Sequence, residues 1–318
     1  MLRTSSQRLS PLAFLGARPL LAAGLGASAI AFSAVFVRLA DAEPTTVAVF
    51  RTAYALPVLA LLAWIERVRF GPRGARAHRL AAIAGVAFAA DLILWHHSID
   101  AVGAGLATVL GNLQVVVVGV LAWFLLHEKP DRRLFASIPI VVVGVIFVSG
   151  VVGAGAFGDD PALGVIFGVA TSIAYSVFIL VHREGARDLR RPAGPLLEAS
   201  AWAAVVATVF GLLDRSVDLT PSWPSHGWLV LLALTSQVLG WLLLSISLPR
   251  LPAALSSVLL LLQPVGALAL GAIILDEDPS VAQFAGVALI LAGVIMAAWR
   301  RGGRITDEPA AIPEPATP

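Results

Sequence analysis

The chain has 318 residues, of which 58% are hydrophobic and only 13% are charged. A soluble domain carries about 25% charged residues because its surface faces water, so this composition excludes an ordinary soluble protein. Cysteine is absent, which excludes disulfides. The net charge is only +2, which favours interpreting the basic residues as flanks of membrane segments rather than as a nucleic-acid-binding surface.

Hydrophobic runs of about twenty residues follow one another along the chain, long enough to cross a bilayer core of about 30 Å. Because backbone groups in lipid must be satisfied within each segment, every run is predicted to be a helix. Arg3 and Arg8 imitate the start of a signal peptide, but the first run continues to Val37 and is interpreted as a span. The ten predicted spans are Pro19–Val37, Pro44–Ile65, Leu80–Ser98, Val102–Leu126, Leu134–Val152, Pro161–Val181, Pro195–Leu213, Trp228–Leu248, Ala253–Leu275 and Val281–Trp299.

These spans divide the chain into four parts. Residues 1–18 form an N-terminal tail, and residues 19–152 and 161–299 each hold five spans. Residues 300–318 form a proline-rich tail that is expected to be disordered. The loops between spans are short and leave no room for a separate soluble domain.

Basic residues gather on one side of the predicted membrane. Only Arg38 and Arg215 lie on the opposite side and Arg51 lies within a span, so 19 of the 22 Lys and Arg residues share one side. Asp41 and Asp159 are among the acidic residues on the other side. Under the positive-inside rule, this bias places both termini in the cytoplasm. Lys129 is the only lysine beside many arginines and alanines, which favours a GC-rich bacterial genome and hence the plasma (inner) membrane.

An internal repeat relates the two halves. A shift of 149 residues aligns 104–146 with 253–295, and 16 of these 43 positions are identical, including Gln114 with Gln263. A repeat of five spans is odd, so the second half must be inverted relative to the first. The predicted fold is therefore an all-α integral membrane protein of ten transmembrane helices, built as two inverted five-helix repeats around a central cavity.

Two segments carry a recognisable pattern. Residues 250–265 read RLPAALSSVLLLLQPV and are followed by Leu275-Asp-Glu and by residues 288–295, ALILAGVI. They resemble the ninth and tenth helices of the EamA family in the drug/metabolite transporter superfamily. Residues 102–128 resemble its fourth helix. The family usually has a proline where this chain has Val115, so the first half is expected to lack the kink that Pro264 gives the second.

The resemblance covers about residues 20–299 and implies ten helices around a central cavity. It also implies export or exchange of metabolites, amino acids or drugs, without naming a particular substrate. No cofactor is implied. We find no phosphate-binding glycine loop and no hydrolase motif, so the chain is not expected to be an enzyme or to hydrolyse ATP by itself.

Arg51 and Asp91 are ionisable residues inside predicted spans, which makes them functional candidates. Each lies about eight residues from the same end of its helix, or about 12 Å deep at 1.5 Å per residue. They either pair with each other or face one cavity. Asp91 is the candidate for proton coupling, and a purely structural ion pair is the alternative.

Other polar and aromatic residues in the spans complete the candidate substrate site. Trp95 follows Asp91 by one helical turn and supplies either an aromatic wall or part of an interfacial aromatic belt. His96 and His97 lack the converging ligands of a metal site, and no metal is expected. The remaining candidates are Asn112, Gln114, Tyr175, Gln237, Trp241 and Gln263.

Together these features predict a secondary transporter, an exporter or exchanger that works by alternating access. Its partners are a small-molecule substrate, membrane lipid and, in the coupled case, protons. A passive facilitator or pore is the main alternative, and a membrane-embedded sensor or enzyme is a weaker one. A monomer or a homodimer would suffice for this function.

Overall fold

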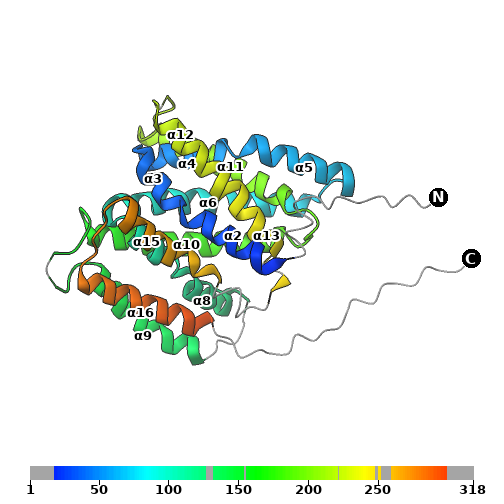
Figure 1. Cartoon of the computed structure of the whole chain (residues 1–318). Coiled ribbons are helices and arrows are strands. Elements are labelled where there is room, and N and C mark those ends of the chain that lie inside the picture. Colours follow the sequence, from blue (N-terminus) through cyan, green and yellow to red (C-terminus); the bar gives the residue numbers. More distant parts are fainter. Residues whose placement is uncertain are drawn as a thin grey trace, which may run out of the picture.

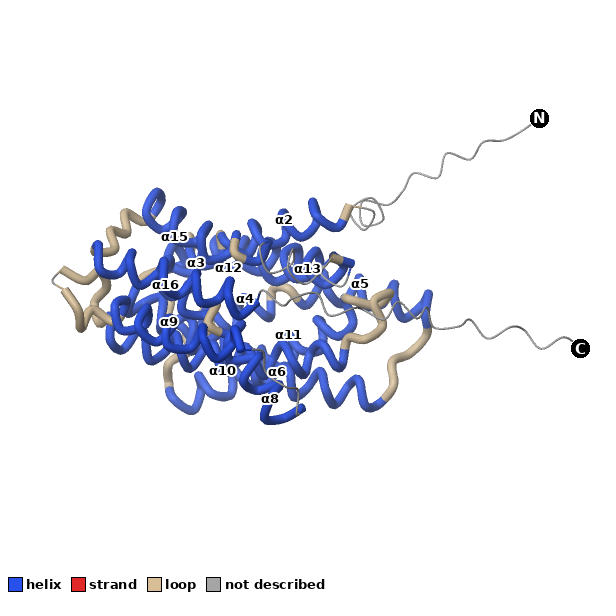
Figure 2. The backbone as a smooth tube through the Cα atoms, turned by 90° about the horizontal axis from the view of Figure 1, so that it is seen from below, coloured by secondary structure: helices blue, strands red, loops and turns tan. Residues whose placement is uncertain are grey.

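The computed structural model describes residues 18–126, 132–153, 155–220, 222–247, 250–251 and 259–298. All the regular secondary structure assigned within these ranges is helical, and the helices pack into one bundle (Figures 1 and 2). In chain order they are α2 (Pro19–Ala31), α3 (Ser33–Ala40), α4 (Pro44–Ala53), α5 (Leu56–Phe70), α6 (Ala75–Val102), α7 (Ala104–Gly111), α8 (Gln114–Leu126), α9 (Arg132–Val148), α10 (Pro161–Gly185), α11 (Ala193–Asp214), α12 (Ser225–Leu232), the π-helical segment η1 (Ala233–Gly240), α13 (Trp241–Ser247), α15 (Leu262–Ile274) and α16 (Val281–Ala298).

Eight of the ten predicted spans coincide with described helices, or runs of helices, that are long and apolar enough to cross a membrane. The fifth predicted span holds α9, which is shorter at 17 residues. The ninth holds α15, and residues 252–258 before it lie outside the described residues, as do most of the two predicted tails. The fold is that of a multi-pass helical membrane protein, and the count of ten spans stays a prediction.

Small residues bring the helices into close contact, and such packing is a main source of helix association in lipid. An added Cβ on Gly164 would lie 2.5 Å from the Cβ of Val102, and one on Gly168 would lie 2.6 Å from the Cβ of Leu110. These two glycines therefore form a close-packing face of α10. They seat α10 across the junction between α6 and α7.

The loops gather at two ends of the bundle. One end, called here the acidic end, holds residues 41–43, 215–220, 222–224 and 275–280. Thr46, in the first turn of α4, accepts a hydrogen bond from the N–H of Asp218 at 2.8 Å and so joins α4 to the second of these segments. The other, called the basic end, holds residues 71–74 and 186–192, joined where Arg191 donates to the carbonyl of Gly71 at 2.9 Å.

A buried carboxylate caps a helix at the acidic end. Glu277 is only 6% exposed and accepts hydrogen bonds from the N–H groups of Ala104 at 2.5 Å and Gly105 at 3.0 Å. These N–H groups begin α7 and have no partner within their own helix. Glu277 therefore caps the start of α7, whereas Glu128, its counterpart in the 149-residue repeat, lies outside the described residues.

Replacing Glu277 by alanine should lower the free energy of unfolding by about 1–2 kcal/mol, because two helix-terminal N–H groups lose their acceptor. Thermal unfolding of the purified protein in detergent measures this change. Asp278→Ala, at an exposed neighbouring carboxylate, is the control and should leave the midpoint unchanged. Equal midpoints for the two variants would contradict the capping role.

Candidate functional site

Several membrane spans are interrupted around Arg51. The first span breaks at Phe32 between α2 and α3, the second at Tyr54 between α4 and α5, and the eighth in η1. Pro57 in the first turn of α5 accounts for the second break, because proline has no N–H to continue the helical hydrogen bonding. Discontinuous helices of this kind commonly form binding sites in membrane proteins.

The fourth span is also interrupted, which corrects the expectation drawn from Val115. Helix α7 ends at Gly111 and α8 begins at Gln114. The N–H of Leu113 donates to the carbonyl of Leu110 at 3.0 Å, which is the i→i−3 bond of a tight 3₁₀ turn. A local change in the hydrogen-bond pattern therefore breaks this span without a proline.

Arg51 of α4 is 4% exposed and is held by neutral groups from three other spans. Its Nε donates to Oε1 of Gln237 at 3.3 Å, and its Nη1 donates to Oγ of Ser33 at 3.2 Å. Its Cζ lies 5.6 Å from the ring centroid of Trp95, where the electron-rich face of the indole attracts a cation. The predicted residues Arg51, Trp95 and Gln237 thus form one cluster.

Asp91 of α6 is 7% exposed, and the Thr171 hydroxyl donates to its Oδ1 at 2.7 Å. The charges of Arg51 and Asp91 interact with each other and with the hydroxyl of Tyr175. Among the described residues, however, no ion pair within 4.0 Å joins Arg51 to Asp91. The two charges share one region of the protein without neutralising each other in direct contact.

Aromatic side chains fill the space between this region and the basic end. The rings of Phe88 and Phe178 stack with centroids 4.4 Å apart. Trp241 meets Phe178 edge-on at 5.3 Å and Tyr175 at 6.1 Å. Tyr175 lies one helical turn beyond Thr171, and Trp241 one turn beyond Gln237, in the direction of the basic end. The aromatic block, as we call the rings of Phe88, Tyr175, Phe178 and Trp241, therefore lies on the basic-end side of the two charges.

The three remaining predicted residues are amides that lie beside the helix breaks. The amide nitrogen of Asn112 donates to the carbonyl of Thr108 at 2.9 Å, within its own span. Gln114 begins α8 and Gln263 lies in the first turn of α15, and each is 9% exposed. In the described part of the chain, none of these amides forms a hydrogen bond with Arg51 or Asp91.

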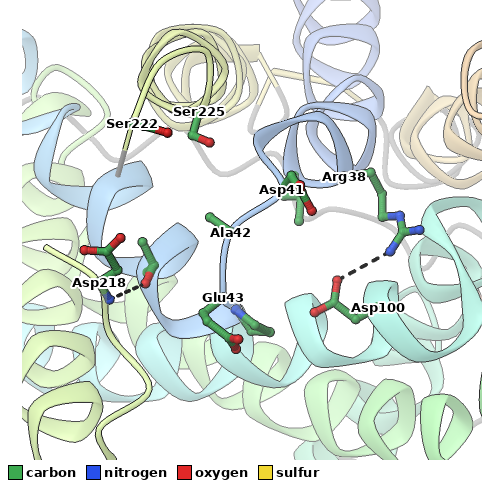
Figure 3. A pocket seen from close by; sticks show the side chains of 11 residues that line it. Arg38, Asp41, Ala42, Glu43, Asp100, Asp218, Ser222 and Ser225 are labelled. Carbon is green, nitrogen blue, oxygen red and sulfur yellow. Dashed lines mark hydrogen bonds and ion pairs between the residues drawn. The ribbon is translucent and has the colours of Figure 1, made fainter. Parts of the chain in front are cut away.

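A pocket of about 530 Å³ opens at the acidic end (Figure 3). Carboxylates dominate its charged lining, which consists of Arg38, Asp41, Glu43, Asp100 and Asp218. Arg38 Nη1 lies 3.7 Å from Oδ1 of Asp100, and both side chains are nearly half exposed. Because a concave acidic surface concentrates cations, this pocket favours positively charged groups.

The pocket is linked to the Arg51 cluster by one chain of contacts. Pro44 lines it, and the carbonyl of Pro44 accepts a hydrogen bond from Nδ1 of His96 at 3.0 Å. His96 is the next residue after Trp95, whose indole lies against Arg51. Pro44 and Arg51 are also about two turns apart on the same helix, α4.

Ionic contacts and hydrogen bonds link the described elements at the basic end. Arg73 donates to Glu198 at 2.8 Å, and His78 lies 2.9 Å from the same carboxylate. Burial lowers the pKa of the Arg73 guanidinium, and the charge and hydrogen bond of Glu198 partly offset this effect. Glu66 also accepts a hydrogen bond from the N–H of Ala193 at 2.9 Å, which ties α5 to the start of α11.

The EamA-like transporter family matches residues 5–150 and 162–299 of this chain. The chain belongs to that family. It is accordingly a membrane transporter of the drug/metabolite type, and the resemblance noted in the sequence is confirmed.

Two further comparisons place this EamA-like transporter. The uncharacterized transporter YetK of Bacillus subtilis (strain 168) is 25% identical over 199 residues, an alignment that covers 59% of this chain and 58% of YetK. A solved structure, described only as a crystal structure of protein, has a TM-score of 0.60 and 17% identity. It covers 89% of this chain and 98% of its own, and it supports the fold alone.

Three residues of this EamA-like transporter take part in the cluster although they were not predicted to be in the site. Ser33 accepts a bond from Arg51, Ser200 accepts one from Nε2 of Gln237 at 2.9 Å, and His96 links the cluster to Pro44. A signal for Ser33 exists in the sequence, because residues 30–33 (Ile-Ala-Phe-Ser) resemble residues 173–176 (Ile-Ala-Tyr-Ser) of the second half. Single serines in apolar spans carry no comparable signal, because many of them only bond to their own helix.

Gln237→Leu should lower the free energy of unfolding of this EamA-like transporter by about 1–3 kcal/mol, because Arg51 Nε and the Ser200 hydroxyl would both lose a buried partner. Thr235→Val is the matched control, since its exposed hydroxyl bonds only to the carbonyl of Leu231. The thermal midpoint in detergent checks the difference. Equal losses in both variants would contradict a specific role of Gln237.

Proposed function

We propose that this EamA-like transporter is a secondary carrier that exports or exchanges a small organic metabolite, amino acid or drug by alternating access. The observation that carries the proposal is the state of Arg51 and Asp91. They are opposite charges, each less than 10% exposed, that share one region without pairing directly. Their position beside broken helices is where carriers bind their substrates.

The energetics of burial favour a ligand over a purely structural role. A structural ion pair offsets the desolvation of its two charges only when their contact is close and well bonded. Here the bonded partners of Arg51 are a neutral amide and a hydroxyl, and the partner of Asp91 is a hydroxyl. A substrate that carries charged or strongly polar groups would complete both sites.

Reciprocal contacts between α9 and α16 support ten spans in two inverted halves. In the 149-residue repeat Gly144 is equivalent to Gly293, and Ser137 to Gly286. An added Cβ on Gly144 would lie 2.8 Å from the carbonyl oxygen of Gly286, and one on Gly293 would lie 3.4 Å from that of Ser137. Equivalent residues make such reciprocal contacts when a two-fold axis relates them.

A helix break follows the same relation. The break at Asn112 corresponds to a turn at Leu261, 149 residues later, immediately before α15. The third and eighth spans, which are equivalent in the proposed repeat, each carry a polar residue and a tryptophan four residues later, Asp91 with Trp95 and Gln237 with Trp241, although the shift between these pairs is 146 residues. This correspondence supports a site at the interface of two halves, around a central cavity.

The charge distribution supports an orientation. The basic end would face the cytoplasm, with both termini on that side, and the acidic end would face outward across a bacterial plasma membrane. The acidic pocket would then be the outer entrance, and the aromatic block with the Arg73–Glu198 contact would be the inner gate. In the proton-coupled form of this proposal, Asp91 exchanges a proton when the site changes sides.

Transport is tested by reconstituting the protein in liposomes and measuring uptake of labelled amino acids, amines and cationic drugs, with and without a pH gradient. We expect saturable uptake that falls at least tenfold in Arg51→Ala, since a lost bond to a charged group is worth roughly that factor. Asp91→Asn should abolish any stimulation by the pH gradient. The surface variants Arg76→Ala and Asp278→Asn serve as controls.

The same assay separates a carrier from a passive facilitator. Unlabelled substrate inside the liposomes should accelerate uptake by a carrier, because the loaded site returns faster than the empty one. A pore would show neither saturation nor this acceleration. Full, gradient-dependent transport by Asp91→Asn would reject proton coupling through that residue.

The proposed orientation is tested with single cysteines, since the natural chain has none to react. Ser222→Cys at the acidic end and Ala75→Cys at the basic end are both exposed positions. A membrane-impermeant maleimide applied to intact cells should label Ser222→Cys and spare Ala75→Cys until the cells are opened. The reverse labelling would overturn the orientation.

A further inference from the structure

His96 of α6 is the most completely buried titratable side chain beside the Arg51 cluster, with 0% exposure. Its Nδ1 lies 3.0 Å from the carbonyl oxygen of Pro44. A carbonyl can only accept a hydrogen bond, so Nδ1 carries the proton and Nε2 of the neutral ring is an acceptor. That Nε2 atom is buried and has no hydrogen-bond partner in the described residues.

A buried hydrogen-bond acceptor without a donor is costly in a protein interior, so the unpaired Nε2 of His96 indicates that a bound molecule supplies the donor. Arg51 has an unused donor nearby. Its Nε and Nη1 are bonded, whereas Nη2 forms no hydrogen bond within the described ranges. The guanidinium is near enough to act electrostatically on the His96 ring, and Trp95 lies next to both.

We infer that His96 is a specificity-determining residue whose Nε2 accepts a hydrogen bond from the transported solute. The solute is a small polar organic molecule that presents an N–H or O–H to His96 and an acceptor oxygen to Nη2 of Arg51. A molecule without such a donor gains nothing from His96. This inference rests on the proposed transport function and adds a contact residue and a chemical requirement to it.

Two substitutions separate the ligand role from the structural one. In His96→Asn, the amide nitrogen takes the place of Nδ1 and keeps the bond to Pro44, but no atom replaces Nε2. In His96→Gln, the longer side chain places its oxygen near the position of Nε2 and gives up the Pro44 bond. If His96 is structural, the loss of the Pro44 bond in His96→Gln should do the greater damage. If His96 binds the solute, the loss of the Nε2 acceptor in His96→Asn should weaken binding more.

The probes are labelled L-alanine, L-phenylalanine, L-lactate, putrescine and tetraphenylphosphonium, in liposome uptake and in thermal-shift binding to the purified protein. L-Alanine, L-phenylalanine and L-lactate have both a donor and an acceptor, and tetraphenylphosphonium has no N–H or O–H. For a solute of the first kind that the wild type carries, His96→Asn should raise KM about tenfold while lowering the thermal midpoint less than His96→Gln does, because it keeps the Pro44 bond. His96→Gln should lower the midpoint and change KM less.

The outcomes distinguish this inference from the proposed function. An unchanged KM in His96→Asn, with transport intact, would overturn the role of His96 and leave the carrier standing. Equal effects on tetraphenylphosphonium and on L-alanine would do the same. Solutes that stabilise the wild type but not His96→Asn, without any uptake, would support the contact and reject transport. Neither uptake nor stabilisation by any probe would overturn both.

Discussion

The guanidinium of Arg51 is the group on which the organisation of this site depends. A permanent charge within the membrane needs hydrogen bonds and an attractive field that lipid does not provide. Gln237, Ser33 and the face of Trp95 supply them from three other spans. Because these spans come from both halves of the sequence, the need of the Arg51 guanidinium for bonded partners holds segments that are distant in the chain close together.

Interruptions in the helices make this arrangement possible. The breaks at Phe32, Tyr54 and Asn112 and the π-helical segment η1 leave backbone groups to be satisfied locally, which membrane interiors permit only where protein surrounds them. The π-helical geometry is rare and frequent at functional sites, and here it carries Gln237, which bonds Arg51 on one side and Ser200 on the other. Irregular backbone and buried charge occur together here, because the π-helical segment places Gln237 where its oxygen can accept a hydrogen bond from Arg51.

The two ends of the bundle differ in their contacts. At the acidic end a pocket opens, and Pro44 in its lining bonds to His96 beside the Arg51 cluster. On the basic-end side of the buried charges lie the aromatic block and the contact of Arg73 with Glu198. In the proposed carrier mechanism the two ends would open in turn, and the proposed inverted halves would offer a direct route, since each half could take the packing of its counterpart.

The sequence by itself determined the membrane class, eight of the spans and the family, since hydrophobic length and a recognisable motif are local properties that do not depend on tertiary structure. It also selected Arg51, Trp95 and Gln237, because polar groups in apolar runs are conspicuous. Only the tertiary structure decided that Arg51 and Asp91 do not pair, that the fourth span breaks without a proline, and that His96 keeps an unused acceptor. Those outcomes depend on distances of a few ångströms between helices far apart in the chain, which helical periodicity does not encode.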